Sequence, residues 1–165
     1  MKSITLKLSI IMLSLAAMTF TFAEDKPAEE WLFVHTAEEA QVTNNTTIVM
    51  PVTRDIFAFT DRPYRKHAYM TGEQFASLWD EGASFKTDPP NAVLTWIDGE
   101  DVKEAEVVIT GASFDGNTIT YNRKYSAIVP FGKLNSISLF VDGDPCVRVL
   151  GSYSNPGPPC SGIEV

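Results

Sequence analysis

The sequence predicts a mostly β fold, an antiparallel β-sandwich or a partly open barrel, with one short α-helix. Short apolar segments with the alternation typical of strands recur along most of the chain after residue 30. Turn residues, including several Asp-Gly pairs, separate these segments. A single interval has the capping residues and the spacing of a helix. Many short strands with turn signals and one helix favour a sandwich or a barrel.

The predicted strands share a short length and an apolar face. In chain order they are residues 31–36, 46–52, 55–60, 92–98, 105–114, 118–122, 125–131 and 136–142. In residues 55–60 the alternation places Phe57 and Phe59 on one face and Ile56 and Ala58 on the other. The DGN sequence after residue 114 predicts a hairpin turn between two of the strands.

The helix is predicted over residues 71–81. Thr71 and Gln74 have the spacing of a capping box, in which each side chain accepts a backbone N–H from the other residue. Gly82 marks a C-terminal stop. The apolar residues that should pack this helix against the sheet are Met70, Phe75, Leu78 and Trp79. We therefore expect Trp79 to lie in the core rather than at a ligand.

Residues 1–23 are typical of a secretory signal peptide. Lys2 and Lys7 precede an uncharged apolar run, and small residues occupy the last positions before a cleavage site after Ala23. The alternative is an uncleaved N-terminal anchor, although the run is short for a membrane span. Cleavage predicts a periplasmic or secreted protein, with a flexible leader at 24–30 and one β-rich domain at 31–143.

The mature chain is predicted to be acidic. Loss of the two lysines in the signal segment leaves 11 basic and 21 acidic residues, a net charge of −10. Nucleic acid is a poor partner for such a surface, because its binding requires a basic patch. No membrane span is expected after signal cleavage, and no cofactor is predicted. The partner is expected to be a protein or a small anionic or sugar ligand.

Cys146 and Cys160 predict a disulfide bond in a C-terminal tail, residues 144–165. An even number of cysteines in an oxidising compartment favours pairing. Two free thiols or metal ligands are the alternatives. Metal binding is weakly supported, because the two histidines, His35 and His67, lie far from both cysteines in the sequence. His35 follows two apolar residues in a predicted strand, and we expect a hydrogen-bonded structural role for it.

Three segments follow one another along the chain: FTDRPYR at 59–65, TGEQFASLW at 71–79 and DPPNAVL at 88–94. They match an aromatic-S/T-D-R-P-x-R segment, a T-x-x-F-x-x-x-W helix and an N/D-P-P-N-A-x-L strand. In these motifs and their order the chain resembles a family of small exported bacterial proteins of unknown function. The resemblance spans about residues 30 to 143. It implies an exported single-domain protein and supplies no reaction.

The candidate functional residues gather at 61–69, immediately before the helix. Arg62 and Arg65 could bind a carboxylate or phosphate, and Tyr69 is a residue type common at interfaces. His67 with Asp61 forms a candidate acid–base pair, because histidine titrates near neutral pH. The structural alternative is that Asp61 caps a turn at Pro63 and pairs with Arg62 or Arg65.

Three roles are compatible with these residues. The first is a non-catalytic binding or accessory module whose contact surface is residues 62–69. The second is a small hydrolase or anion-processing enzyme that uses His67 with Asp61 and Arg65, although no nucleophile–base motif supports catalysis. The third is a structural protein of the cell envelope. The Asp-Gly turns at 98, 115 and 142 lack the full pattern of a calcium loop, so no metal site is predicted.

Overall fold

Eight strands form one antiparallel sheet in this computed structural model, which describes residues 29–125 and 128–143. The strands are β1 (Trp31–Asn44), β2 (Thr47–Pro51), β3 (Ile56–Thr60), β4 (His67–Met70), β5 (Asn91–Asp98), β6 (Asp101–Phe114), β7 (Thr118–Arg123) and β8 (Gly132–Asp142). Three short helical segments lie between β4 and β5: α1 (Gly72–Ala76), η1 (Ser77–Trp79) and α2 (Ser84–Thr87). The predicted mostly β, antiparallel class is confirmed.

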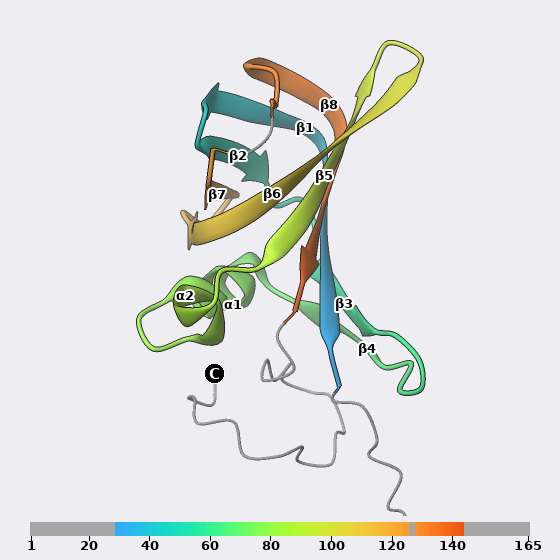
Figure 1. The fold of residues 1–165 in the computed structure, drawn as a ribbon, viewed down its shortest axis with the longest axis vertical. Coiled ribbons are helices and arrows are strands. Elements are labelled where there is room, and N and C mark those ends of the chain that lie inside the picture. Colours follow the sequence, from blue (N-terminus) through green and yellow to red (C-terminus); the bar gives the residue numbers. More distant parts are fainter. Residues whose placement is uncertain (1–28, 126–127, 144–165) are drawn as a thin grey trace, which may run out of the picture.

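The sheet closes on itself through β1. The strand order is β2-β7-β6-β5-β8-β1-β3-β4, and a further pairing joins β2 to β1. Strand β1 pairs with β8 along most of its length, with β3 near its start and with β2 near its end. The result is a ring-like sheet from which the β3–β4 hairpin extends to one side (Figure 1).

A coordinated bend in β1 and β8 lets β1 change partners. Residues 31, 33, 35 and 37 are buried, but after Glu38 and Glu39 the buried positions are 40 and 42. Strand β8 changes its inner face at the same level without a change of register: its buried positions are 137, 139 and 141 on one side of Ser136, which has a left-handed φ of 48°, and 134 on the other. Both strands therefore redirect their inner faces together. The apolar alternation of the sequence breaks at this bend, which is why the prediction ended the first strand at residue 36.

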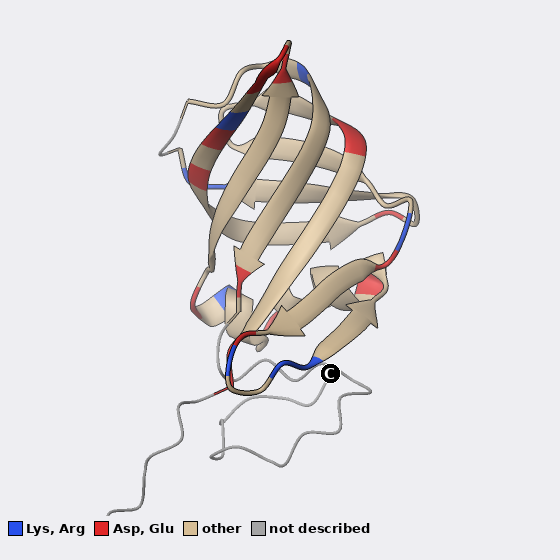
Figure 2. Ribbon diagram, turned by 90° about the vertical axis from the view of Figure 1, so that its right-hand side faces the viewer, with Lys and Arg blue, Asp and Glu red and all other residues tan. Residues whose placement is uncertain are grey.

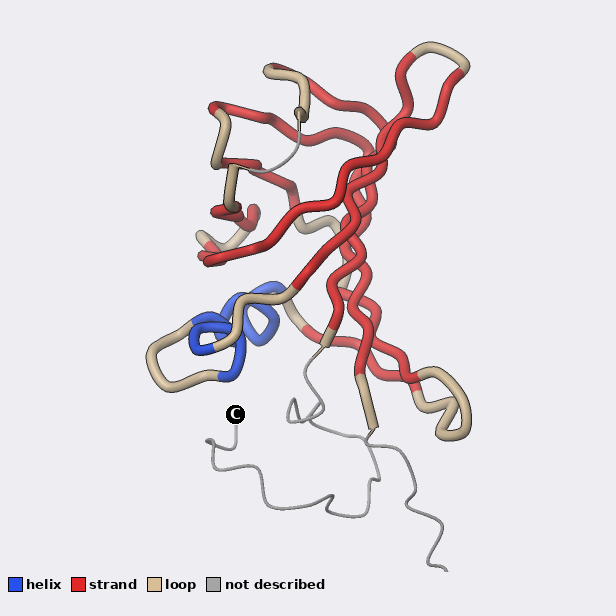
Figure 3. Tube along the Cα trace, viewed as in Figure 1, coloured by secondary structure: helices blue, strands red, loops and turns tan. Residues whose placement is uncertain are grey.

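An aromatic cluster fills the space between the ring and the helical segments. Phe33 contacts Phe75 and Phe85, with ring centroids 5.3 and 6.0 Å apart. Trp79 packs on Phe85 at 4.8 Å and donates its Nε1–H to the carbonyl of Ile109, 3.0 Å away. Trp79 is 4 % exposed, so the prediction that it lies in the core is confirmed. Figure 3 shows the helical residues gathered at one end of the strands.

The predicted helix is present but is regular over a shorter span. Thr71 and Gln74 form the predicted capping box, with both reciprocal hydrogen bonds in place. The α-helix ends at Ala76 and continues as a tighter 3-10 turn to Trp79. Asp80 is already extended, so the segment stops before Gly82. The tighter turn accompanies the burial of both Leu78 and Trp79 against the sheet.

The strand predicted at 125–131 is wrong for its described residues, which carry no strand pairing. This segment connects β7 to β8, and those strands are not neighbours, because β6 and β5 lie between them. A connection that crosses to another part of the ring has no adjacent strand to pair with. Pro130 also lacks the N–H that a ladder position would use.

Strand β4 is the one strand of the described chain that no predicted segment covers. Its four residues follow a basic turn and are too few to show alternation alone. It forms because β3 folds back on it as a hairpin, with Phe57 opposite Tyr69 and Phe59 opposite His67.

Several predictions fall on residues outside the described ranges. They are the signal peptide, the Cys146–Cys160 disulfide and the C-terminal tail, and each stays a prediction. Within residues 29–125 and 128–143, no helix combines the length and the apolar character needed to cross a membrane.

We expect Thr71→Ala to lower the free energy of unfolding by about 1 kcal/mol, because it removes the acceptor for the Gln74 N–H at the start of α1. Urea unfolding at pH 7 measures the change. Thr53→Ala is the matched control, since Thr53 is exposed and lies in the β2–β3 connection. Equal stability of the two variants would show that the capping box does not hold this helix.

Candidate functional site

The β3–β4 hairpin, residues 56–70, carries every candidate site residue that the sequence singles out. Asp61, Arg62 and Arg65 lie in its turn, and His67 and Tyr69 lie in β4. The hairpin projects away from the ring, so its outward face and its turn are not covered by other strands of the described chain (Figure 1).

Asp61 holds the turn together. Its carboxylate Oδ1 accepts the N–H of Arg62 at 2.6 Å. Its backbone carbonyl accepts the N–H groups of Tyr64 and Arg65, each at 3.1 Å. Arg65 adopts a left-handed φ of 51°, which closes the turn before β4. The predicted turn-capping role of Asp61 is therefore confirmed, whereas no ion pair joins Asp61 to Arg62 or Arg65 within the described chain.

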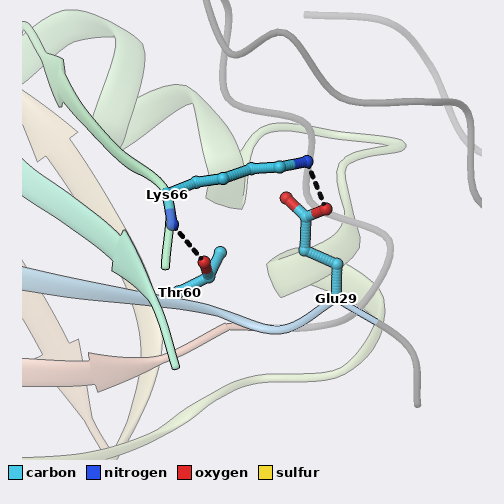
Figure 4. Close-up of polar contacts among 3 residues, drawn as sticks. All are labelled: Glu29, Thr60 and Lys66. Carbon is cyan, nitrogen blue, oxygen red and sulfur yellow. Dashed lines mark hydrogen bonds and ion pairs between the residues drawn. The ribbon is translucent and has the colours of Figure 1, made fainter. Parts of the chain in front are cut away.

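Lys66 links the turn to Glu29, two residues before the start of β1. Its Nζ lies 2.7 Å from Glu29 Oε2, and both side chains are mostly buried (Figure 4). Its backbone N–H donates to Thr60 Oγ1 at 2.8 Å, and Nζ lies 5.7 Å from the ring centre of Tyr64. Lys66 thus has a structural partner on each side. Its charge is compensated by Glu29 within the protein.

Arg62 and Arg65 differ from Lys66 in this respect. Both side chains are exposed, and neither has an ion pair among the described residues. His67 is also exposed, at the first position of β4. Figure 2 shows basic residues along this turn and acidic residues at the tip of the β5–β6 hairpin, at the opposite end of the molecule. The turn is therefore a local cationic site on an acidic chain.

An apolar row on the outward face of the sheet begins at Tyr69. We call it the outer row. Tyr69 lies opposite Phe57, Phe57 opposite Val34, Val34 opposite Phe140, and Phe140 opposite Val93. Its two most exposed aromatic side chains are Tyr69, which is 64 % exposed, and Phe140, which is 42 % exposed. The row crosses β4, β3, β1, β8 and β5, so it is a property of the assembled sheet.

The hairpin end of the outer row is aromatic. The Phe57 ring lies 5.3 Å from that of Tyr69 and is stacked on that of Phe59 at 5.7 Å. The sequence analysis found the two faces of residues 55–60 but did not identify which one is buried, because both faces are apolar. In the structure Ile56 and Ala58 are fully buried, and the phenylalanines face outward. The surface aromatics were missed for this reason.

A further buried polar contact lies inside the ring, away from the hairpin. His35 is 1 % exposed, and its Nδ1 accepts a hydrogen bond from the Tyr121 hydroxyl at 2.8 Å. Its Nε2 donates to the carbonyl of Pro51 at 3.1 Å. Burial lowers the pKa of His35 from 6.5 to about 4 and raises that of Tyr121 well above 10. The expected structural role of His35 is supported, since both ring nitrogens have internal partners.

The arrangement at the hairpin is better suited to contact than to chemistry. The Asp61 carboxylate is engaged by the Arg62 amide, and the described chain shows no hydrogen bond between Asp61 and His67. Among residues 29–125 and 128–143, no cluster of three or more His, Cys, Asp or Glu side chains could hold a metal ion. Exposed aromatic and arginine side chains are the residue types that dominate protein interfaces.

Comparisons with protein-family models, with curated proteins and with solved structures find no match to this chain. The resemblance to a family of small exported proteins accordingly stays a prediction. Any functional assignment depends on the geometry of the hairpin and on its charges.

The lowered pKa of His35 predicts that the free energy of unfolding decreases as the pH falls. Above pH 6.5 the imidazole is neutral in both states, and its contribution is complete. Between pH 6.5 and about 4 the unfolded chain takes up a proton that the native chain does not, so the free energy of unfolding falls. Over the full interval His35 lowers the free energy of unfolding by about 3 kcal/mol. Below about pH 4 this residue adds no further loss.

Urea unfolding between pH 7 and pH 4.5 measures this dependence. His35→Gln keeps one donor and one acceptor but does not titrate, so we expect a shallower loss of stability with falling pH than in the wild type. His67→Gln is the matched control, because His67 is exposed. If His35→Gln and the wild type lose stability in parallel, the buried imidazole is not the source of the pH dependence.

Proposed function

We propose that this protein is an exported, non-catalytic binding or accessory module whose contact surface is the outward side of the β3–β4 hairpin. The observation that carries the proposal is the combination of exposed Tyr69, packed on Phe57, with the exposed Arg62 and Arg65 beside it. An apolar patch next to unneutralised cations is typical of a surface that binds another molecule.

The local electrostatics support an anionic contact. The chain as a whole carries 21 acidic and 13 basic residues, so a partner with a carboxylate meets repulsion over most of the surface. The turn at 61–66 is the exception. Since Lys66 is already paired with Glu29, the two arginines supply the available positive charge. Arginine binds carboxylates through two parallel hydrogen bonds, which adds direction to the attraction.

The packing of the hairpin supports a rigid contact surface. The inner side of β3 is fully buried at Ile56 and Ala58, and Met70 anchors the end of β4 in the core. The aromatic residues outside are therefore held on a fixed backbone and lose little freedom on binding. An enzyme that uses His67 with Asp61 and Arg65 has less support, because the Asp61 carboxylate is engaged inside the turn.

The proposal predicts that changes on the hairpin reduce partner binding. The immobilised full chain is incubated with an envelope extract of the source cells, and bound proteins are quantified by mass spectrometry. We expect Tyr69→Ala and Arg65→Asn each to reduce the recovery of a specific partner by roughly tenfold, as for interface anchors. Asparagine is chosen because it tolerates the left-handed φ of Arg65.

Two matched controls test whether the effect is local. Val102→Ala removes an apolar side chain that is 75 % exposed on the β5–β6 hairpin, and Arg54→Asn removes an exposed arginine outside the β3–β4 turn. Both controls should bind as the wild type does. The proposal fails if Tyr69→Ala and Arg65→Asn recover the same proteins in the same amounts as the two controls.

A further inference from the structure

Two open stretches of edge in the described sheet differ in chemistry. Strand β4 ends the strand order and pairs with β3 alone. In β6 the first half pairs with β5 alone, because the pairing with β7 begins at Ile109. An open edge offers unpaired backbone groups to any extended chain, and natural sheets protect such edges with charged side chains.

The β6 edge is protected in this way, whereas the β4 edge is not. Along residues 101–107, four side chains are charged: Asp101, Lys103, Glu104 and Glu106. Strand β4 has the sequence HAYM, which contains no lysine, aspartate, glutamate or proline. The edge that lies beside the exposed aromatic residues is thus the one left open to pairing.

The hydrogen-bond register shows which groups β4 presents. Thr60 N–H donates to the carbonyl of Lys66 at 2.9 Å, which makes this a hydrogen-bonded pair. Because such pairs alternate along an antiparallel ladder, His67 and Tyr69 are at the non-bonded positions opposite Phe59 and Phe57. Their backbone N–H and C=O groups therefore point away from β3, toward the open edge.

We propose that β4 binds an extended, acidic protein segment as an added antiparallel or parallel strand. The inference rests on the proposed binding function and names its partner class. Main-chain hydrogen bonds to His67 and Tyr69 supply the pairing. Alternate side chains of the added strand extend the outer row beyond Tyr69, and its carboxylates meet Arg62 and Arg65 at the adjoining turn.

Charge complementarity favours this occupant over a second copy of the protein. A second copy that paired through its own β4 would bring no carboxylate from that strand. A copy that paired through the open half of its β6 would bring Lys103 to the arginines together with its carboxylates, and such pairing would protect the β4 amides of the free protein increasingly with protein concentration. An acidic segment from another protein satisfies both the open backbone groups and the two arginines.

The test uses the full chain and a defined probe, the capped peptide Val-Glu-Val-Glu-Val-Glu, with the lysine peptide Val-Lys-Val-Lys-Val-Lys as its matched control. Amide NMR spectra and hydrogen exchange are recorded during titration. We expect the acidic peptide to bind at least roughly tenfold more tightly than the basic one, since like charges at the turn oppose the latter. We also expect the amides of His67 and Tyr69 to exchange rapidly in the free protein and to become protected on binding.

Two changes isolate the main-chain hydrogen bonds. Tyr69→Pro removes an N–H that faces the open edge and takes no part in the pairing with β3, whereas Tyr69→Ala removes the side chain and keeps that N–H. We expect Tyr69→Pro to bind at least roughly tenfold more weakly than Tyr69→Ala. If Tyr69→Pro does not fold, the acidic peptide with every backbone nitrogen methylated makes the same test on the wild type, and it should not bind.

The outcomes separate this inference from the proposed function. Equal binding of the methylated and unmethylated peptides would overturn strand addition and leave a contact through side chains. Equal binding of the acidic and basic peptides would overturn the acidic partner. Protection of the His67 and Tyr69 amides in the free protein would show that the edge is already occupied, by a second copy if protection grows with protein concentration, and would overturn the proposal. The proposed function is judged independently by the envelope extract.

Discussion

The pairing of β1 with β8 is the constraint on which the rest of this fold depends. The two strands are hydrogen-bonded along most of their length and bend together at Glu38–Glu39 and Ser136. Below the bend the free side of β1 pairs with β3, and above it with β2. A straight β1 would have a single neighbour on that side. The bend therefore closes the ring and also directs β3 and β4 away from it.

Because β3 and β4 leave the ring, one side of their hairpin is buried and the other is exposed. Because β3 joins the sheet outside the ring, its inner side packs into the hydrophobic core, and no other described element forms a layer over its outer side. Ile56, Ala58 and Met70 are buried in the core, while Phe57 and Phe59 are only half-buried outside. Burial of the phenylalanines instead would require a one-residue slip, which would move every side chain of the strand to the other face. The register set by β1 thus fixes which residues the outer side of the hairpin presents.

The sequence predicts the parts of this structure that depend on local chemistry. The capping box at Thr71 and Gln74, the buried Trp79 and the turn held by Asp61 each depend on residues close together in the chain, and each is found. The strand predictions fail where pairing between strands, rather than the local sequence, decides whether a segment becomes a strand. β4 exists because β3 pairs with it, and the described residues 125 and 128–131 remain unpaired because they belong to a connection between distant parts of the ring. The outer row joins five strands, so no local pattern reveals it.

The contrast between Lys66 and its neighbouring arginines separates structural charge from charge that a partner can use. The Lys66 ammonium pairs with the mostly buried Glu29 while its backbone N–H donates to the Thr60 hydroxyl, and loss of the Lys66 side chain would leave that carboxylate without its cation. Arg62 and Arg65 serve no such internal need, since backbone hydrogen bonds to Asp61 already hold the turn. Exposed cations that the fold does not require, beside an unprotected sheet edge, are the features on which the proposed binding function rests.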